Sequence, residues 1–343
     1  FEGQKTDLSK DFIKTVISPL YGAYKSLCVE RDKRGPLDLD MPEERIYLDE
    51  KGQVAKIAPR PRLNSHRLIE EFMILANVAA AIELETRQHL CMYRVHDEPS
   101  LEKVDALREF LKGFDLSLPK GQAIRPKIFN HILEKAKESP AQGAINQLVL
   151  RAQAQAVYSP ENIGHFGLNL PRYCHFTSPI RRYADLVVHR ALVEVMTNNK
   201  DTPSSYTLPQ LKAVAEHISL TERVAATAER ETTERYVAAY LKDKIGQSFM
   251  ARINGVTEFA MFVTIEENGA DGIMPLRLLA DDYYAYDQKK QRVVGRRKKR
   301  IYTLGDRLKV TLHEAEPLLG GLTFLPAETQ KKAMISSRKK RWK

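Results

Sequence analysis

The chain changes character near Ile245-Gly246, and this change constrains its fold more than any other feature. Before that point, apolar residues recur at helical spacing along several long segments. After it, short β-like runs are separated by turns, and these runs are FMARINGV, FAMFVTI, DGIMPL, RLKVTL and GGLTFL. Five such strands within about 80 residues are typical of a small barrel of the OB type. The sequence therefore predicts an α+β protein with a mostly helical part at 1–243, a barrel at 244–327 and a basic tail at 328–343.

The helical part is expected to begin with a helix and a hairpin. Residues 1–30 carry apolar side chains at helical spacing, namely Phe12, Val16, Leu20 and Leu27. Residues 34–62 alternate apolar and polar side chains around Lys51-Gly52, which predicts a short hairpin.

A long helix and several shorter ones are expected next. Asn64 is expected to cap the long helix. Its apolar face would consist of Leu68, Phe72, Leu75, Ala79 and Ile82. Residues 99–158 predict further helices that are broken at Pro119, Pro126 and Pro140, and residues 208–243 predict another long helix.

The segment HFGLNLPRYCHFTSPIRRYADLVVHR, residues 165–190, places two arginines where a helix disfavours them. Ser178 is a good N-cap and Pro179 follows at the first helical position, so a helix is expected to begin at Ser178. Arg181 and Arg182 would then lie in its first turn, where each cation opposes the macrodipole at a cost of about 0.3–1 kcal/mol. A bound phosphate would explain this placement, because free N–H groups and two guanidinium groups would converge on it. The alternative is two solvated arginines at a helix end.

The net charge of +10 comes from two short segments. Residues 289–300 hold eight Lys or Arg, residues 331–343 hold seven, and neither segment contains an acid. The rest of the chain has 39 basic and 44 acidic residues. Such concentrated charge favours a polyanionic partner. Nucleic acid is preferred over a membrane surface, because the tail lacks the apolar face of an amphipathic anchor.

The composition excludes several classes of protein. With 43% hydrophobic residues the chain is globular. No uninterrupted apolar run is long enough to span a bilayer, and no secretory signal opens the chain. Cys28, Cys91 and Cys174 have neither zinc-site nor disulfide spacing, so a reducing cytoplasm is the simplest location. Cys174 is expected to be buried apolar filler and not a nucleophile.

Residues His165 to Leu168, Thr177 to Tyr183, Asp185 and His189-Arg190 resemble the signature of the ribonuclease II/ribonuclease R family of 3′→5′ exoribonucleases. Residues 64–77, 93–100 and 158–168 are similar to the ribonuclease R branch of that family, so the resemblance covers nearly the whole chain. It implies a hydrolytic, processive nuclease that degrades single-stranded and structured RNA to 5′-mononucleotides. It also implies that Mg²⁺ is bound by a cluster of aspartates.

The resemblance also implies roles for individual residues. Arg181 would contact the phosphate near the scissile bond, with Arg182 as a second candidate. Tyr183 would contact RNA or orient the loop. Glu70 or Glu71 matches a position that contacts the terminal nucleotide, although an ordinary surface glutamate is an even alternative. Structural support is expected from Ser178, Pro179, Asp185, His165 and His189, and a role in fixing a loop is expected from His96 and Asp97.

The metal-binding aspartates of the family lie upstream of every segment matched here. Asp38 with Asp40 and Asp281 with Asp282 are acidic pairs, but we expect both to be ordinary surface acids. The chain is therefore expected to be the C-terminal part of the catalytic domain followed by the barrel, with no metal site of its own. Some relatives stack the terminal base on an aromatic residue after an RG dipeptide, where this chain has Leu37 and Leu39.

The barrel is similar to RNA-binding domains of the ribosomal-protein-S1 type. Phe259 and Phe262 lie where such domains present aromatic side chains, although core packing is an equal alternative for Phe259. Tyr283, Tyr284 and Tyr286 are expected in a loop before the basic run. Aromatic residues beside basic ones suit base stacking at roughly 1–3 kcal/mol per base, together with phosphate attraction. The basic residues expected to bind RNA are Lys289, Lys290, Arg296, Arg297, Lys298, Lys299 and Arg300.

Two functions follow from these patterns. The first is a Mg²⁺-dependent exoribonuclease, of which this chain would be a monomeric, RNA-binding and weakly active part. The second is a non-catalytic module that binds RNA through its barrel and basic segments. A basic scaffold on ribosomes ranks last, because it leaves Arg181 and Arg182 unexplained.

Overall fold

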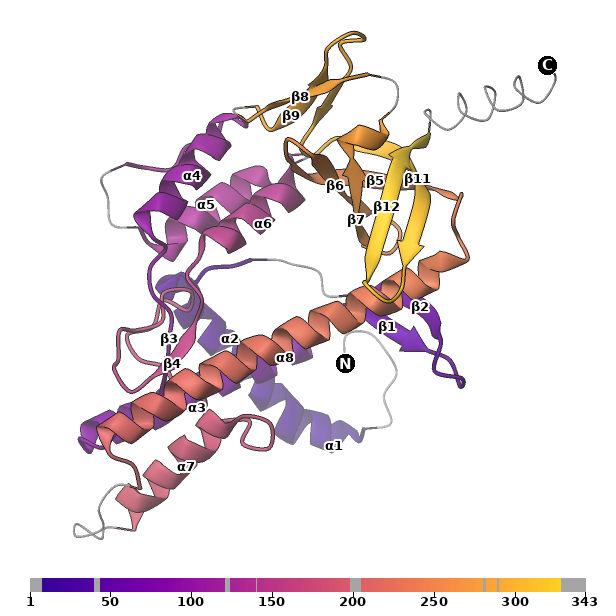
Figure 1. Ribbon diagram of the computed structural model, residues 1–343. Helices are drawn as coiled ribbons and strands as arrows, with labels where there is room; N and C mark the ends of the chain where they lie inside the picture. Colours follow the sequence, from indigo (N-terminus) through magenta and orange to yellow (C-terminus); the bar gives the residue numbers. More distant parts are fainter. Residues whose placement is uncertain are drawn as a thin grey trace, which may run out of the picture.

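The computed structural model describes residues 8–39, 44–120, 124–139, 141–197, 205–279, 282–288 and 290–327. It contains a helical part and a closed barrel, which are joined by the long helix α8, Leu208–Lys242 (Figure 1). Across the described residues, no helix is both long and apolar enough to cross a lipid bilayer. The predictions for Asp40, Pro140, Asp281, Lys289 and the tail at 328–343 lie outside the described residues.

The N-terminal elements agree with the sequence. A helical segment consists of α1, Lys10–Phe12, a π-helical stretch η1, Ile13–Ile17, and α2, Ser18–Arg34. Strands β1, Glu44–Leu48, and β2, Val54–Pro59, pair antiparallel, which confirms the predicted hairpin. The carboxylate of Asp49 closes the turn, because it accepts hydrogen bonds from the backbone N–H groups of Lys51 and Gln53, both at 2.9 Å.

The long helix α3, Asn64–Thr86, confirms the predicted element but not its details. Its N-cap is Leu63, whose N–H donates to His66 Nδ1 at 3.1 Å, so Asn64 is not the cap. Only Leu68 of the predicted apolar face is buried; Phe72 is half-buried, and the remaining three residues are exposed. The helix instead buries the face that carries Glu71 and Asn77, because both side chains find polar partners in the interior.

Three shorter helices follow: α4, Leu101–Lys112, α5, Pro126–Ala136, and α6, Gln142–Ala152. They confirm the predicted helices at 99–158 and the breaks at Pro119 and Pro126. The Ser100 hydroxyl caps α4 by accepting from Lys103 N–H, and Pro126 occupies the start of α5. Strands β3, Tyr93–Val95, and β4, Val157–Ser159, flank the three helices in sequence and pair antiparallel.

The predicted helix start at Ser178 is wrong. Helix α7 spans Tyr183–Met196, and residues 178–182 form a turn in which the N–H groups of Arg181 and Arg182 donate to Ser178 O at 3.3 and 3.2 Å. Arg182 is the N-cap, with extended backbone, so both arginines precede the helix. The first turn carries Asp185, an acid that the macrodipole favours there.

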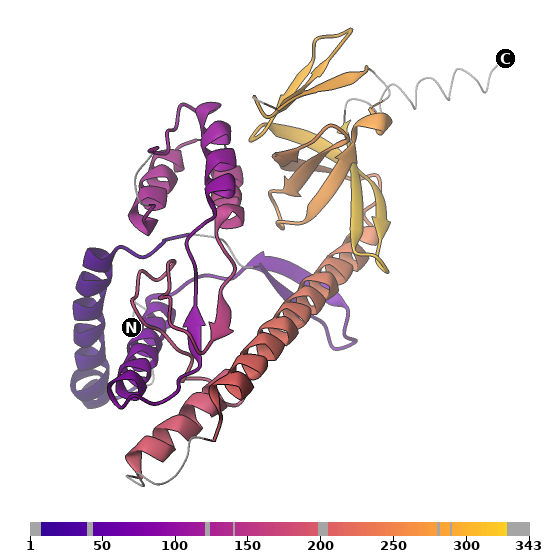
Figure 2. The ribbon, with the colours of Figure 1, turned by 60° about the vertical axis from the view of Figure 1, so that its left-hand side comes forward.

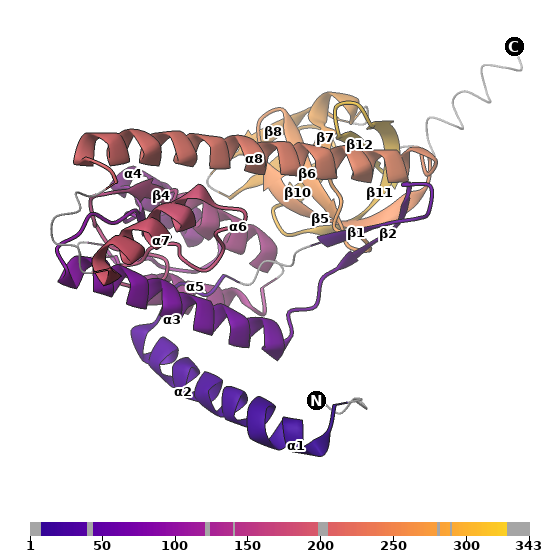
Figure 3. The same cartoon turned by 90° about the horizontal axis from the view of Figure 1, so that it is seen from below.

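Helix α8 runs along the helical part and reaches the barrel (Figure 3). Thr207 and Gln210 cap its start, since Thr207 N–H donates to Gln210 Oε1 at 2.9 Å. The helix packs against β4 near one end, and against β2 and the barrel near the other. It confirms the long helix predicted at 208–243.

The barrel consists of β5, Ser248–Val256, β6, Ala260–Ile265, β7, Asp271–Pro275, β11, Arg307–Glu316, and β12, Gly321–Pro326. The strands close in the order β11-β12-β7-β6-β5, with β12 and β7 parallel and the other neighbours antiparallel. Buried residues alternate with less buried ones along much of the strands, with bulges between Ile253 and Gly255 and between Leu312 and Glu314. Ile253, Met261 and Phe324 are fully buried. The five predicted strands are confirmed.

A second sheet lies between β7 and β11 in sequence, after a single 3-10 turn η2, Leu276–Leu278. It contains β8, Tyr284–Asp287, β9, Arg292–Gly295, and β10, Ile301–Thr303. The predicted loop is therefore wrong for Tyr284 and Tyr286, which lie in β8, whereas Tyr283 precedes that strand. Val293 and Tyr302 are buried and anchor the sheet, most of whose other strand residues are half-buried, whereas the basic residues of its turns are exposed. We call these three strands, with the turns between them, the basic sheet.

Two glycines allow the barrel to approach the helical part closely (Figure 2). Both have positive φ, +89° at Gly305 and +73° at Gly320. A Cβ at Gly305 would lie 2.9 Å from Ala141 Cα beside α6, and one at Gly320 would lie 2.8 Å from Glu234 Cβ on α8. One continuous core then joins α4, α5 and α6 to the barrel interior. The barrel is therefore held at two points and packed between them.

Candidate functional site

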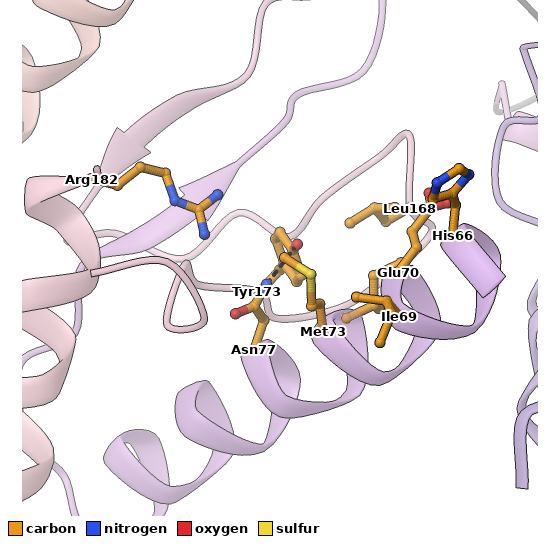
Figure 4. A pocket seen from close by; sticks show the side chains of 9 residues that line it. His66, Ile69, Glu70, Met73, Asn77, Leu168, Tyr173 and Arg182 are labelled. Carbon is orange, nitrogen blue, oxygen red and sulfur yellow. Dashed lines mark hydrogen bonds between the residues drawn. The ribbon is translucent and has the colours of Figure 1, made fainter. Parts of the chain in front are cut away.

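Two adjoining cavities lie between α3 and the signature segment at 165–190, and they share Glu70, Ile74 and Leu168. We call them together the arginine cleft. The first, of about 380 Å³, has Arg182 on one side and α3 side chains on the other (Figure 4). The second, of about 310 Å³, is lined by three cations and three acids, namely Arg31, Arg34, Arg62, Asp38, Glu70 and Glu71. Cavities of this size suit a nucleotide-sized ligand with several polar groups.

Asp185 holds the signature turn in place. Its side chain is fully buried, and Oδ1 accepts from Ser178 N–H at 2.7 Å and from Arg182 Nη2 at 2.9 Å. Its Oδ2 lies 2.8 Å from Arg182 Nε, so the carboxylate contacts the guanidinium through two of its nitrogens. Arg182 is therefore already paired, and it reaches the first cavity with its orientation fixed. Pro179 lies in the same turn.

Arg181 differs from its neighbour. It is exposed, and no described acid lies within salt-bridge distance of its guanidinium. Ile180 beside it is also fully exposed. Tyr183 is exposed at 43%, and its hydroxyl is 2.9 Å from that of Tyr206. Of the two predicted phosphate ligands, Arg181 is the one available to an added anion.

Asn77 on α3 ties the signature segment to the cleft floor. It is buried, its Nδ2 donates to Tyr173 Oη at 2.9 Å, and its Oδ1 accepts from Phe176 N–H at 2.9 Å (Figure 4). The buried Cys174 donates its thiol to Asn77 O at 3.2 Å, which places it in the interior as predicted. The sequence pattern missed Asn77, because a polar residue on a helix is normally assigned to the solvent side.

Glu70 and Glu71 occupy different environments. Glu70 borders both cavities and pairs with Arg62 at 2.6 Å. Glu71 is buried 3.4 Å from Arg31 Nε, and burial raises the pKa of its carboxyl against the opposing effect of Arg31 and Arg34. Glu70 is thus the better placed of the two to contact a ligand.

Arg34 is a candidate that sequence reasoning missed. Its Nε and Nη2 atoms are buried, border the second cavity and have no hydrogen-bond partner among the described residues. Burial lowers the pKa of this guanidinium, although nearby Glu71 opposes the shift. An unpartnered buried donor costs about 1–3 kcal/mol, which an anionic ligand would relieve. In the sequence, the dipeptide Arg34-Gly35 served only to locate Leu37 and Leu39, and it gave Arg34 itself no role.

The histidines of the signature make hydrogen bonds within the fold. His165 Nδ1 accepts from Leu168 N–H at 3.1 Å, and burial together with His96 and Arg94 lowers its pKa to about 3. His189 lies 2.9 Å from Phe176 O and stacks on that ring. His175, which the sequence did not single out, has its pKa lowered to about 2 by burial and by Arg182 and Arg94.

The loop at His96 and Asp97 is fixed by local hydrogen bonds. His96 Nε2 lies 2.9 Å from Ala154 O, and its Nδ1 accepts from Gly167 N–H at 2.9 Å. Asp97 Oδ1 accepts from Glu98 N–H at 2.8 Å. Leu37, which stands where some relatives have an aromatic residue, donates its N–H to Gly167 O at 2.7 Å. Its side chain and that of Leu39 pack against the core.

The described acids do not form a metal site. Within the described ranges, no group of three or more His, Cys, Asp or Glu side chains is placed to hold a metal ion. Asp38 is exposed and pairs with Arg31 at 3.4 Å. Asp282 accepts from the N–H groups of Tyr283, Arg297 and Lys298, and these bonds outweigh desolvation and lower its pKa. The acids in the described part of the chain therefore do not form a site that fits Mg²⁺.

Aromatic side chains of the barrel and the basic sheet are exposed on their surface. Phe259 is 73% exposed, Phe262 42% and Tyr283 68%, so the core-packing alternative for Phe259 is wrong. Arg297 lies over the Tyr283 ring, 5.3 Å from its centroid. Tyr284 differs, because it is half-buried beside Tyr302 at 5.7 Å.

The described basic residues predicted to bind RNA gather on the basic sheet. Exposed positions are held by Lys290, Arg296, Arg297, Lys298 and Lys299, whereas Arg300 is half-buried with its guanidinium over Tyr302. Asp282 fixes the turn at 296–299 through the backbone bonds described above. Figures 1 and 2 place this sheet far from α7, so the predicted site residues form two separate groups.

Comparison with known proteins assigns the chain. Residues 1–198 match the family model of the RNB domain, and residues 242–317 match that of the S1 RNA binding domain. The chain belongs to the RNB family. The expected family resemblance is thereby confirmed.

Several relatives of this RNB chain are known. Ribonuclease R of Aquifex aeolicus is 41% identical over 287 residues, which are 84% of this chain and 41% of that protein. The structure of Mycoplasma genitalium RNase R in complex with ribose methylated single-stranded RNA matches 95% of this chain and 51% of that one, at 27% identity and a TM-score of 0.84. Its complex with double-stranded RNA matches 95% and 53%, at 25% identity and a TM-score of 0.77. The chain spans about 40% of the length of the curated relatives that it matches.

Proposed function

We propose that this chain binds RNA and forms the gripping part of a hydrolytic, processive 3′→5′ exoribonuclease that releases 5′-mononucleotides. The observation that carries the proposal is the arginine cleft. It combines unpartnered N–H groups of Arg34 with a fixed Arg182, and Arg181 is exposed beside it, outside the two cavities, in a chain of the RNB family. Such donors suit the phosphates of a nucleotide chain better than any neutral ligand.

Each group has a distinct task in this proposal. Arg181 contacts the phosphate next to the scissile bond, and Arg182, held by Asp185, positions the turn that presents it. Glu70 at the border of both cavities accepts hydrogen bonds from the ribose hydroxyls of the terminal nucleotide. Arg34 meets a phosphate in the second cavity.

The barrel supplies a second grip. We divide the chain into a helical part at 1–243, an OB-type S1 barrel at 244–327 and a basic tail at 328–343. Phe259, Phe262 and Tyr283 stack on bases, while the basic sheet attracts the phosphate backbone of the RNA.

The expected ligand is single-stranded RNA, and structured RNA is a further one. The chain is expected to bind both as a monomer. A cytoplasmic location stays a prediction that rests on the three cysteines.

Hydrolysis in this family is expected to use Mg²⁺, which would activate water and neutralise the scissile phosphate. The described acids do not form a site for it, so its ligands would have to lie outside the described residues. We assign no catalytic step to Asp38 or Asp282. The isolated chain is therefore expected to bind RNA with little hydrolysis.

The alternative is a non-catalytic RNA-binding module. The same absence of an acidic cluster among the described residues favours it. A module of this kind would need the barrel and the basic sheet but no cleft able to hold a 3′ end.

The first test is incubation of the purified chain with 5′-labelled single-stranded RNA and Mg²⁺, with binding measured in parallel. Binding without shortening is the expected result. Stepwise shortening from the 3′ end would mean that a metal site lies within these 343 residues. No binding at all would contradict the proposal in both its forms.

Arg181→Ala separates the two forms when tested in a full-length protein that contains the chain. It should lower turnover more than RNA affinity, because one phosphate contact among many is lost. Arg223→Ala, at an exposed position on α8, is the matched control and should change neither. Equal losses of turnover and affinity for Arg181→Ala would make it a general binding residue.

A further inference from the structure

A third cavity, of about 600 Å³, lies between the barrel and the helical part. One wall is formed by α6 and α8 and carries Arg151 together with Arg230 and Glu234, which lie 3.9 Å apart. The other wall is formed by β5, β6 and β7 and carries Asn254, Phe262 and Asp271. None of these residues belongs to the arginine cleft or to the basic sheet. We call this cavity the junction groove.

Asp271 is presented to the junction groove in a fixed orientation. Its Oδ1 accepts hydrogen bonds from Thr264 Oγ1 and from Asn254 Nδ2, the latter at 3.1 Å. Asn254 Nδ2 also donates to Thr264 Oγ1 at 2.6 Å, which closes a three-membered network. The second carboxylate oxygen of Asp271, Oδ2, has no hydrogen-bond partner among the described residues. The carboxylate therefore keeps one acceptor for a ligand.

An aromatic ring and a cation complete the surroundings of that acceptor. Phe262 is 42% exposed and lines the same groove, so one face of a planar ligand can stack on it. Arg151 lies close enough to act electrostatically on Asp271, is exposed, and has no salt-bridge partner among the described residues. A ring, an acceptor and a cation are the three groups that a nucleotide engages with its base face, base edge and phosphate.

The two walls of the groove are packed against each other at two close contacts. Gly305 against Ala141 and Gly320 against Glu234 hold the barrel to the helical part, and Gly320 itself lines the groove. A ligand that binds the free oxygen of Asp271 therefore does not lose binding free energy to ordering the barrel relative to the helical part.

A lone carboxylate oxygen discriminates between bases by their exocyclic groups. Cytosine and adenine present an amino group that donates to it. Uracil presents a carbonyl oxygen in the corresponding place, and its only ring N–H lies between two carbonyl oxygens that repel the carboxylate. Since a hydrogen bond to a charged group is worth more than one between neutral groups, loss of this bond is expected to weaken binding about tenfold or more.

We propose that the junction groove binds one nucleotide of an RNA strand and that Asp271 selects a base with an amino group over uracil. This inference rests on the proposed RNA binding and adds a base preference to it. Phe262 stacks on the selected base, and Arg151 contacts its phosphate.

The test compares the affinities of the chain for oligocytidylate and oligouridylate of equal length. Wild-type protein should bind oligocytidylate about tenfold more tightly. Asp271→Asn keeps the size of the side chain and an oxygen for Thr264 and Asn254, but it replaces the free acceptor with a donor. This variant should lose the preference or reverse it.

Two control variants make the outcome decisive. Glu267→Gln removes the same charge from an exposed residue outside the groove, so it should keep the wild-type preference. Phe259→Ala, also outside the groove, should weaken both oligonucleotides alike. Equal wild-type affinities, or a preference that survives in Asp271→Asn, would overturn the inference while leaving RNA binding intact. Failure of both oligonucleotides to bind would instead overturn the proposed function itself.

Discussion

The arginine cleft and the basic sheet both present cations, but they hold them in opposite ways. In the cleft, Arg182 pairs with a fully buried Asp185, and Arg31 pairs with a buried Glu71. On the basic sheet, Arg296 and Arg297 are exposed at the surface. The first arrangement fixes where a phosphate can sit, whereas the second creates a field that attracts any phosphate.

The cleft therefore determines the position of a bound phosphate, and the basic sheet determines how strongly RNA is attracted to the surface. Buried pairs are screened little by salt, and their geometry is set before a ligand arrives. Exposed cations lose most of their reach over about 8–10 Å at physiological ionic strength. Changes in the cleft should therefore affect folding and turnover, and changes on the basic sheet should affect the salt dependence of binding.

The largest expected effect comes from Asp185→Ala. The change leaves the largely buried Arg182 guanidinium without its carboxylate and removes the acceptor of Ser178 N–H. Breaking a buried pair in this way costs about 3–5 kcal/mol of the free energy of unfolding. Urea unfolding followed by circular dichroism measures it.

Two variants sharpen this prediction. Glu216→Ala, at an exposed position on α8, should change the free energy of unfolding by less than about 0.5 kcal/mol. Replacing both partners together, as Arg182→Met with Asp185→Leu, should restore most of the loss. If Asp185→Ala and Glu216→Ala have the same free energy of unfolding, the Arg182–Asp185 pair does not stabilise the cleft.

A second effect concerns pH and comes from buried imidazoles of the segment 165–190. His165 and His175 have pKa values lowered to about 3 and about 2, below the value of about 6.5 expected when unfolded. Between these values the unfolded chain binds more protons, so stability is full above pH 6.5 and falls as the pH is lowered. From pH 6.5 to 5.5, each imidazole should remove about 1 kcal/mol from the free energy of unfolding.

Urea unfolding at several pH values between 7.5 and 5.5 tests this slope. His175→Gln should reduce the fall in the free energy of unfolding between pH 6.5 and 5.5 by about 1 kcal/mol, whereas His217→Gln, at an exposed position on α8, should leave the fall unchanged. A free energy that is flat down to pH 5.5 would show that the two imidazoles are not buried in their neutral form.

The smallest effect on stability is expected from the basic sheet. Arg296→Gln with Arg297→Gln removes two exposed cations and should change the free energy of unfolding by less than about 0.5 kcal/mol. It should reduce the slope of log affinity against log salt by about 1.4, at about 0.7 for each phosphate contact on a single strand. Fluorescence anisotropy at several salt concentrations measures the slope.

Lys212→Gln with Arg223→Gln removes the same charge from exposed positions on α8 and should leave the slope unchanged. If both double variants lower the slope equally, net charge and not the basic sheet determines attraction. The contrast between the two regions would then fail.

The order of the elements could be predicted from the sequence, because period and proline breaks are local signals. The barrel strands, the hairpin at β1 and β2 and the long helix α8 all follow from such signals. The start of α7 could not be predicted in this way. Ser178 and Pro179 form a good local start, but Asp185, seven residues on, takes the Ser178 N–H and leaves a turn instead.

Buried polar residues account for most of the remaining differences. The buried face of α3 contains Glu71 and Asn77, whose partners come from distant segments, so apolar spacing selected the wrong face. Arg34 could be recognised as a candidate only from its burial without a partner. The strands of the basic sheet have three or four residues each and are held by cross-strand pairing, which a basic sequence conceals.

Helix α8 makes the two regions into one bivalent receptor. Its 35 residues form a rod of about 52 Å at a rise of about 1.5 Å per residue, and this rod contacts β4 in the helical part and β11 and β12 in the barrel. An RNA held at one grip meets the other at an effective concentration that this rod sets, whatever the concentration in solution. A strand too short to bridge the rod gains nothing from the second grip, so affinity should rise in a step with RNA length and not in proportion to it.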